Sequence, residues 1–236
     1  MIALELFAGS RSFGKVAEEY GHDVISTDIE QFGDIDMVGN VLDIPVETFA
    51  ELKPDIIWAS PPCTTFSIAG CSHHYDKVNG MLVPKSENAM IGQSILFKTI
   101  EIIKFCNPKF FFIENPRGLM RKMPCMKEFE RTTVWYCRYG DFRAKPTDIW
   151  SNHIADLFNP EGWQPRSECF NGNKNCHHES APRSSTVKKL KAQGIEVKIG
   201  GTQGQRNNYE RSKIPEQLMI EIIKSIPNDD TRIEKL

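Results

Sequence analysis

The sequence has no uninterrupted apolar stretch of membrane-spanning length, no internal repeat and no low-complexity tract. Its first residues, MIALELFAGS, have no basic segment followed by a long apolar one, and they carry an acid at Glu5. These absences argue against a membrane protein, a repeat protein and a secreted protein. We therefore expect a cytoplasmic protein with no membrane partner.

A disulfide framework and a strong net charge are also missing. The seven cysteines are an odd number and widely scattered, which indicates reduced thiols. The formal net charge is only −2, but residues 183–213 hold eight Lys or Arg against two Glu. Such a basic segment can neutralise phosphate groups, although a solvated loop without a partner explains it equally well.

Strand-like and helix-like stretches alternate in the first half of the chain, as in parallel α/β folds. Apolar runs predict strands at residues 2–7, 23–27, 38–42, 55–59 and 109–113. Helices are expected near residues 16–20 and 87–106, with a helix end at 128–131. A strand at 132–137 follows, with a hairpin partner at 148–150. The prediction is an α/β fold with a mostly parallel sheet.

The composition divides the chain into three regions. Residues 1–150 carry the alternating pattern and are predicted to form the main domain. Residues 151–213 are rich in Asn, Gly, Pro, Ser and Lys and lack periodicity, which predicts a small irregular insertion. Residues 214–236 are expected to return to the core as a short amphipathic helix opened by Pro215, with a frayed tail.

The first predicted strand leads into a glycine-containing turn and a helix, in the stretch LFAGSRSFG at residues 6–14. Glycines let a ligand approach the backbone closely, and the amides at a helix start face an anionic group. Asp28, at the end of the second strand, can accept both hydroxyls of an adenosine ribose, and Asp43 can bond the adenine amino group. These features favour an adenosine cofactor without separating a dinucleotide from S-adenosylmethionine.

The stretch SPPCTTFS, at residues 60–67, directly follows an apolar strand. Its two prolines cannot continue a sheet, so they direct Cys63 out of the carboxyl edge, where ligands of open α/β sheets bind. Glu114 ends the most apolar strand of the chain, so burial should raise its pKa and suit it to donate a proton. A thiol and a proton donor are therefore predicted at one edge.

These motifs together resemble those of the cytosine-5 DNA methyltransferases, in a compact phage or prophage form. The similar stretches are the glycine motif Leu6-Phe7-Ala8-Gly9, the ribose acid Asp28, the nucleophile loop Ser60-Pro61-Pro62-Cys63 and the acid motif Glu114-Asn115-Pro116. The resemblance implies a Rossmann-like fold that uses S-adenosylmethionine to methylate carbon 5 of cytosine in double-stranded DNA. It also implies a bacterial or phage-infected host cell, a link to restriction-modification, and no obligate protein partner.

The resemblance also implies a role for each matched residue. Cys63 would add to carbon 6 of a flipped-out cytosine while Glu114 protonates N3. The cofactor contacts would come from Phe7, Ala8, Gly9, Asp28, Ile29, Asp43 and Pro61. The substrate contacts would come from Ser60, Pro62, Asn115, Arg143 and Lys145. Residues 64–86 would form a loop that closes over DNA, residues 1–150 the catalytic core and residues 151–213 the target-recognition region.

The sequence departs from the family pattern in three places. Arg11-Ser12 stands where the family's turn usually has further glycines. The family's Gln-x-Arg-x-Arg motif, which helps to hold the flipped base, falls on Arg143, Lys145 and Thr147. The late Gly-Asn motif is not evident, and residues 201–204 and 214–215 are expected to do related work beside the cofactor.

The insertion contains the pattern C-x6-C-H-H at residues 169–178, which is not a familiar zinc spacing. The prediction is that no metal is bound. The alternative is a zinc site built from Cys169, Cys176 and His177, with His153 or Cys137 as the fourth ligand.

Two other functions compete with cytosine-5 methylation. An amino-group methyltransferase acting on adenine N6 or cytosine N4 needs no cysteine, so the pairing of Cys63 with Glu114 counts against it. A noncatalytic DNA-binding protein with a methyltransferase fold is compatible with the altered base-contact motif. The presence of both catalytic groups counts against that reading as well.

Overall fold

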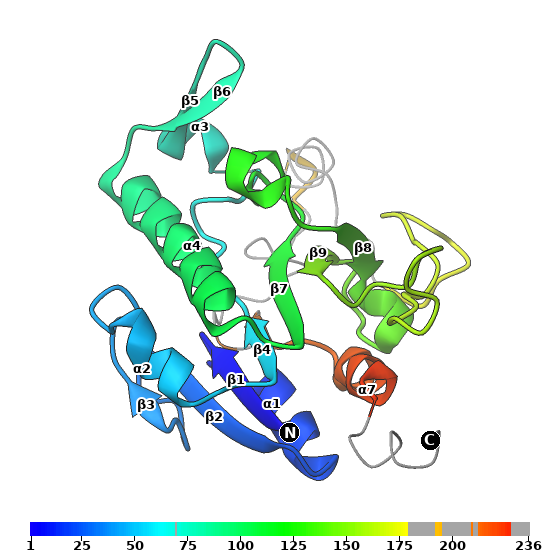
Figure 1. Ribbon diagram of the computed structural model, residues 1–236. Helices are drawn as coiled ribbons and strands as arrows, with labels where there is room; N and C mark the ends of the chain where they lie inside the picture. Colours follow the sequence, from blue (N-terminus) through cyan, green and yellow to red (C-terminus); the bar gives the residue numbers. More distant parts are fainter. Residues whose placement is uncertain (69, 179–191, 195–208, 210–211, 228–236) are drawn as a thin grey trace.

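The computed structural model describes residues 1–68, 70–178, 192–194, 209 and 212–227. Within these residues, seven strands form the main sheet, in the order β3-β2-β1-β4-β7-β9-β8 (Figure 1). Their bounds are β1 Ile2–Leu6, β2 Asp23–Asp28, β3 Met37–Val38, β4 Ile56–Ala59, β7 Phe110–Pro116, β8 Arg131–Trp135 and β9 Pro146–Ser151. The first five strands in that order are parallel, whereas β9 is antiparallel to β7 and β8. The predicted α/β fold with a mostly parallel sheet is confirmed.

Helices cover both faces of the sheet (Figure 1). Those on one face are α2 (Val46–Glu51) and α4 (Glu87–Cys106), and those on the other are α1 (Ser12–Glu19) and α7 (Glu216–Ser225). Because alternate residues of a strand point to opposite faces, Leu4 packs toward α2 and α4 while Ala3 packs toward α1 and α7. Trp58 of β4 is buried on the face covered by α1 and α7, where its ring stacks on that of Phe13 with 5.3 Å between the centroids.

The long helix α4 has clear start and stop residues. The Ser86 hydroxyl accepts the backbone N–H of Ala89 at 3.1 Å, which caps the first turn. At the other end Asn107 takes a left-handed conformation with φ 46°, and Pro108 follows. The predicted helix at 87–106 is confirmed. Its sharp end lets the chain turn back into β7, the strand that carries Glu114.

Three local predictions were wrong. The strand expected at 38–42 is limited to β3, and residues 41–43 form a turn. The helix end expected at 128–131 is a turn leading into β8. Residues 64–86 are not only a loop, because they contain a short helix, α3 (Cys71–His74), and a hairpin of β5 (Tyr75–Val78) and β6 (Met81–Pro84). This hairpin stands out from the body of the protein (Figure 1).

Short 3-10 helices complete the described elements: η1 Met120–Lys122, η2 Pro124–Met126 and η3 Tyr136–Tyr139. No helix in the described ranges has the length and apolar character needed to cross a membrane. Of the basic segment 183–213, most residues lie outside the described ranges, so the boundary of the insertion stays a prediction. Residues 151–178, the first part of the predicted insertion, contain one isolated β-bridge between Ile154 and Trp163.

Candidate active site

The carboxyl ends of β1, β2, β4 and β7 lie at one edge of the sheet, because these strands are parallel neighbours. Asp28 is the last residue of β2, and Ser60 to Cys63 directly follow β4. Glu114 follows Ile113 in β7, and Ile113 pairs with Ala59, the last residue of β4. The structure therefore brings the residues predicted for the cofactor and for catalysis to the same edge.

The loop that carries Cys63 is held by backbone contacts on both sides. The Ser60 N–H donates to the Leu6 carbonyl of β1 at 3.2 Å. On the other side, Asn115 Nδ2 of β7 donates to the Pro61 carbonyl at 2.8 Å. Pro61 is buried in this arrangement, whereas Cys63 is exposed. The thiol is thus presented to solvent from a loop with a fixed base.

Gly118, four residues after Glu114, permits a second contact with the same loop. The Leu119 N–H donates to the Phe66 carbonyl at 2.7 Å, so the two segments run very close together. A Cβ atom at residue 118 would lie 2.2 Å from the Phe66 carbonyl oxygen, a distance that no side chain tolerates. The glycine of the stretch ENPRG is therefore required by packing against the cysteine loop.

Glu114 is a buried acid with only 6% of its surface exposed. The Tyr136 hydroxyl donates to Glu114 Oε1 at 2.9 Å. Burial raises the pKa of Glu114, although the Lys145 charge and hydrogen bonds from Tyr136 and Ser60 oppose the rise. An acid with a raised pKa in a fixed position is suited to protonate a substrate nitrogen.

Tyr136 is the direct partner of this acid and lies at the start of η3. Burial and the charge of Glu114 raise the pKa of Tyr136 well above its usual value, so the phenol keeps its proton. It therefore remains a hydrogen-bond donor over the physiological pH range. The Lys145 ammonium lies over the Tyr136 ring, 4.7 Å from its centroid.

Lys145 and Arg143, the predicted substrate contacts, occupy different settings. Burial lowers the pKa of Lys145, while the charges of Glu114 and Cys63 favour its ammonium form. Lys145 therefore lies within electrostatic reach of both Glu114 and Cys63, the residues predicted for catalysis. Arg143 is almost fully buried and donates to the carboxylate of Asp141, with an additional bond to the Lys213 carbonyl at 3.1 Å. Arg143 is thus engaged inside the protein.

The predicted ribose acid contacts the glycine turn directly. Asp28 Oδ2 accepts the Gly9 N–H at 2.9 Å, and Oδ1 accepts the Glu30 N–H at 3.1 Å. Asp28 remains partly exposed, so its carboxylate has lone pairs left for ribose hydroxyls. Ile29 and Asp43 are exposed on neighbouring loops. In the described part of the chain, no hydrogen bond joins Asp43 to Asp28 or Gly9.

The backbone of the turn is strained at residue 11, where the sequence departs from the expected glycines. Phe7, Gly9 and Arg11 all have left-handed φ values, of 59°, 48° and 52°. A glycine adopts this conformation at little cost, whereas Arg11 adopts it against its side-chain sterics. Arg11 therefore stands at a position where the backbone favours the glycine that the family usually has.

The amides at the start of α1 are already bonded by a residue of β1. Glu5 Oε1 accepts the Phe13 N–H and Oε2 accepts the Gly14 N–H, both at 3.1 Å. Burial raises the pKa of Glu5 to about 8 despite these two bonds. A Cβ atom at residue 14 would lie 2.5 Å from Glu5 Oε2, so Gly14 makes room for the carboxyl group. The anionic partner expected at this helix start is a side chain of the protein itself.

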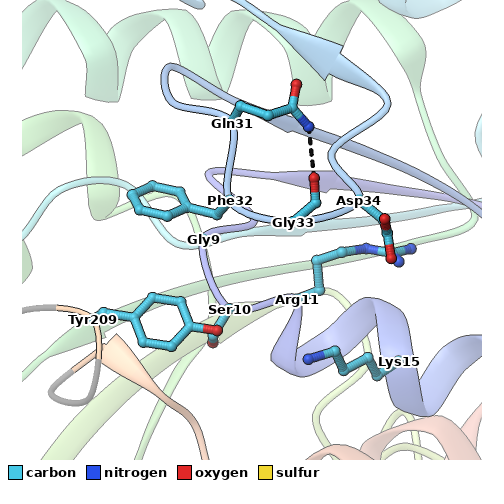
Figure 2. A pocket seen from close by; sticks show the side chains of 9 residues that line it. All are labelled: Gly9, Ser10, Arg11, Lys15, Gln31, Phe32, Gly33, Asp34 and Tyr209. Carbon is cyan, nitrogen blue, oxygen red and sulfur yellow. Dashed lines mark hydrogen bonds between the residues drawn. The ribbon is translucent and has the colours of Figure 1, made fainter.

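A cavity of about 350 Å³ opens beside the glycine turn (Figure 2). Gly9, Ser10 and Arg11 line one side, and the loop from Gln31 to Asp34 lines another. The rings of Phe32 and Tyr209 lie 6.0 Å apart at its margin. The start of α7 is close by, because the Ile214 N–H donates to Ser12 Oγ at 3.2 Å. This places the C-terminal helix next to the turn.

Comparison with known proteins assigns the family. A family model described as C-5 cytosine-specific DNA methylase matches residues 15–132, half of the chain. A probable DNA (cytosine-5)-methyltransferase of frog virus 3 (isolate Goorha) is 31% identical over 184 residues, which cover 74% of this chain and 80% of that protein. The chain belongs to the C-5 cytosine-specific DNA methylases.

Two further comparisons agree with this family. The type II methyltransferase M.HpaII of Haemophilus parainfluenzae is 31% identical over 126 residues, which cover 49% of this methylase and 31% of that protein. The solved structure of the Entamoeba histolytica methyltransferase EhMeth is 13% identical, with a TM-score of 0.56 over 95% of this chain and 97% of that one. The latter likeness supports the shared fold. Family membership makes the chain a cytosine-5 methyltransferase and decides against the amino-group alternative, while the phage or prophage type stays a prediction.

Sequence reasoning missed two residues of the methylase site. Glu5 had a signal, because an acid inside the apolar run IALELF is unusual for a buried strand. Tyr136 had none, because it reaches Glu114 only through the pairing of β7, β9 and β8.

The metal candidates need one correction. His177 donates to the Asp141 carbonyl at 3.0 Å, and His153 packs on Phe110 with its Nε2 against the Ser225 carbonyl. Neither lies with the cysteines. The residue that does is His178, which is buried beside Cys137, Cys169 and Cys176.

Proposed function

We propose that this protein transfers a methyl group from S-adenosylmethionine to carbon 5 of a flipped-out cytosine in double-stranded DNA, with Cys63 as nucleophile and Glu114 as proton donor. One observation carries the proposal: of two adjacent residues of β7, one is the acid and the other holds the loop that carries the thiol. Glu114 is the buried acid, and Asn115 bonds the carbonyl of Pro61 in the cysteine loop at 2.8 Å. A single strand end therefore fixes the acid relative to the thiol, which is the positioning that a two-group reaction needs.

The setting of Cys63 supports a nucleophilic role. The thiolate is the reactive form of cysteine, and a nearby cation favours it. Lys145 interacts electrostatically with both Cys63 and Glu114. We assign Lys145 the task of stabilising the Cys63 thiolate, and we place the target base between Cys63, Glu114 and Lys145.

The reaction follows from these positions. The Cys63 sulfur forms a bond to carbon 6 of cytosine while Glu114 gives its proton to N3, so that carbon 5 becomes nucleophilic. When bound, S-adenosylmethionine would supply an electrophilic methyl group; carbon 5 takes this methyl as its bond to the sulfonium sulfur breaks, which leaves S-adenosylhomocysteine. The proton on carbon 5 then leaves to solvent, the bond to Cys63 breaks, and the N3 proton returns to Glu114.

The cofactor site fits S-adenosylmethionine better than a dinucleotide. A dinucleotide fold binds its pyrophosphate on the amides at the start of the first helix. Here Glu5 occupies the amides of Phe13 and Gly14. Asp28 is partly exposed and keeps lone pairs for the ribose, and its hydrogen-bond partner Gly9 lines the cavity of Figure 2. We propose that Phe7, Ala8, Gly9, Ile29, Asp43 and Pro61 complete this site.

The DNA contacts are assigned to the face beyond the strand ends. A base in a duplex must leave the stack to reach Cys63, at a cost of a few kcal/mol. We propose that Ser60 and Pro62 contact this base, that residues 1–150 form the catalytic core, and that residues 151–213 recognise the target sequence. Asn115 and Arg143 are bonded within the protein, so we assign them the positioning of the loop and of the base pocket.

Bisulfite sequencing tests the reaction and its nucleophile. Plasmid DNA is recovered from cells that express the wild type, Cys63→Ala or Cys106→Ala. Cys106 lies at the end of α4, away from the site, and serves as the matched cysteine control. We expect protected cytosines in one sequence context for the wild type and for Cys106→Ala, and none for Cys63→Ala. Equal protection with Cys63→Ala would refute the nucleophile, and no protection in any context by folded wild-type protein would contradict the methylation of DNA.

The covalent step has its own test. DNA with 5-fluorocytosine at the identified target carries fluorine where a proton must leave, so the Cys63 adduct cannot be resolved. We expect a denaturation-resistant complex between protein and DNA that requires Cys63. Glu114→Gln keeps the shape of the acid without its proton, and we expect it to slow methylation by about 10²–10⁴-fold. A Gln variant with wild-type rate would assign N3 protonation to another group.

A further inference from the structure

Four potential metal ligands gather at one point outside the methylation site. They are the side chains of Cys137, Cys169, Cys176 and His178, and their ligand atoms all lie within 4.8 Å of one another. Cys137 belongs to η3, and the other three belong to the segment 169–178. The Cys169 sulfur is 3.8 Å from His178 Nδ1. The cluster therefore connects η3 with a segment that lies beyond β9 in the sequence.

The four ligand atoms are close enough together to surround one ion with a small contraction of the cluster. Zinc bonds of about 2.3 Å to sulfur and about 2.0–2.1 Å to nitrogen place neighbouring ligand atoms roughly 3.5–3.8 Å apart. The separation of Cys169 Sγ from His178 Nδ1 falls at the upper end of this range. Two backbone turns fold the segment back on itself and support the cluster. In the first, the Asn173 N–H donates to the Phe170 carbonyl, and in the second, the Cys176 N–H donates to the Asn173 carbonyl, both at 3.2 Å.

The surroundings resemble a closed site. Cys137, Cys169 and His178 are buried, with exposures of 1%, 5% and 6%. Asn173 Nδ2 lies 3.5 Å from the Cys169 sulfur and donates to it, which is an outer contact that stabilises a thiolate. Trp135 and Ala144 pack around the sulfur atoms. Three thiols and an imidazole ring meet here, and the three cysteines form no disulfide in the structure.

The donor set selects the metal. Three sulfur atoms and one imidazole nitrogen are soft or intermediate ligands, which disfavours Mg²⁺ and Ca²⁺ because those ions prefer oxygen. Four protein ligands fill a tetrahedral shell and leave no position for a water molecule or a substrate. A site of this kind contributes stability to the fold and takes no direct part in the reaction.

We propose that Cys137, Cys169, Cys176 and His178 bind a structural Zn²⁺ ion that fastens the target-recognition segment to the catalytic core. The attachment point is close to the chemistry, because Cys137 directly follows Tyr136, the hydrogen-bond partner of Glu114. Further bonds run in parallel: Arg138 donates to the Ser167 carbonyl at 3.1 Å, and His177 donates to the Asp141 carbonyl at 3.0 Å. Binding of the metal is independent of whether the protein methylates DNA, so the two proposals fail separately.

Metal analysis of the purified chain is the first test. Protein expressed with zinc in the medium and purified without chelators is measured by inductively coupled plasma mass spectrometry. We expect about one zinc ion per chain in the wild type. Cys176→Ala removes the most exposed of the three thiols and should lose most of the metal, whereas Cys106→Ala should retain it. Full zinc occupancy in a folded Cys176→Ala variant would overturn the ligand assignment.

Cobalt substitution keeps the proposal testable if the variant does not fold. Wild-type protein stripped with chelator and titrated with Co²⁺ should develop visible bands of a tetrahedral complex and near-ultraviolet thiolate bands, both reversed by added Zn²⁺. Absence of these bands in folded wild-type protein would refute the site. A wild-type chain that lacks metal and has lost two hydrogens in its intact mass would also refute it, because two of the cysteines would then form a disulfide.

Discussion

Removing the Tyr136 hydroxyl should change the pH dependence of the reaction in a defined direction. This hydroxyl donates to Glu114 at 2.9 Å in a fully buried setting, and the bond favours the ionised carboxylate. Its loss in Tyr136→Phe therefore raises the pKa of Glu114 further. A hydrogen bond to a charged group contributes about 1.5–3 kcal/mol, and about 1.4 kcal/mol corresponds to one pH unit. If the protonated acid is the active form, the alkaline limb of the pH profile moves upward by about one to two pH units.

The assay is the initial rate of transfer of a tritiated methyl group to DNA, with kcat/KM measured at each pH because it reports ionisations of the free enzyme. The matched control is Tyr139→Phe, which removes a phenolic hydroxyl from η3, the same 3-10 helix. The Tyr139 oxygen accepts the Arg166 N–H at 2.9 Å and has no bond to Glu114. The control should leave the alkaline limb in place. An unchanged or lowered limb in Tyr136→Phe, or an equal shift in both variants, would refute the assignment of Glu114 as proton donor.

Three further changes probe other parts of the site. Gly118→Ala places a methyl group against the Phe66 carbonyl, so the free energy of unfolding in urea should fall by about 1–3 kcal/mol, and unchanged stability would contradict the tight packing. Glu5 has a raised pKa of about 8, so it binds more protons in the folded state, and its contribution to stability is lost as the pH rises from 4.5 to about 8. Glu5→Gln should therefore flatten the fall in unfolding free energy over that range in paired urea titrations, and parallel curves for the two proteins would contradict the shift. Asp28→Ala should weaken S-adenosylmethionine binding by about tenfold to a hundredfold in calorimetry, and the same titration of Asp43→Ala decides whether that acid contacts the adenine.

The parts of the fold that follow from local pattern were predictable. The apolar runs of β1, β4 and β7 and the long helix α4 were identified from sequence because each is set by neighbouring residues. The hairpin of β5 and β6 also had a local signal, since its turn is Asn79-Gly80, with φ values of 50° and 82°. That signal was overlooked because the segment was interpreted as a loop.

The missing parts of the site depend on contacts distant in sequence. Tyr136 reaches Glu114, and Cys137 joins Cys169, only after β8 and β9 pair beside β7. The spacing C-x6-C-H-H directed attention to His177, because sequence gives no rule for which of two adjacent imidazoles faces inward. The placement of Cys63 and Glu114 at one edge was predictable, because Cys63 follows β4 and Glu114 lies near the end of β7, and the carboxyl ends of these parallel neighbours share an edge.

The Glu5 carboxyl group at the start of α1 bears on competition between S-adenosylmethionine and other adenosine compounds in a cell. ATP and NAD carry the same adenosine that we propose Asp28 binds, and cells contain both in abundance. Their phosphates would need donors at the start of α1, but Glu5 already holds the amides of Phe13 and Gly14. A nucleotide would have to displace a buried side chain to gain those bonds. We therefore expect the proposed site to disfavour ATP and NAD, because the Phe13 and Gly14 amides are not available to their phosphates. Methylation should continue when nucleotide levels rise.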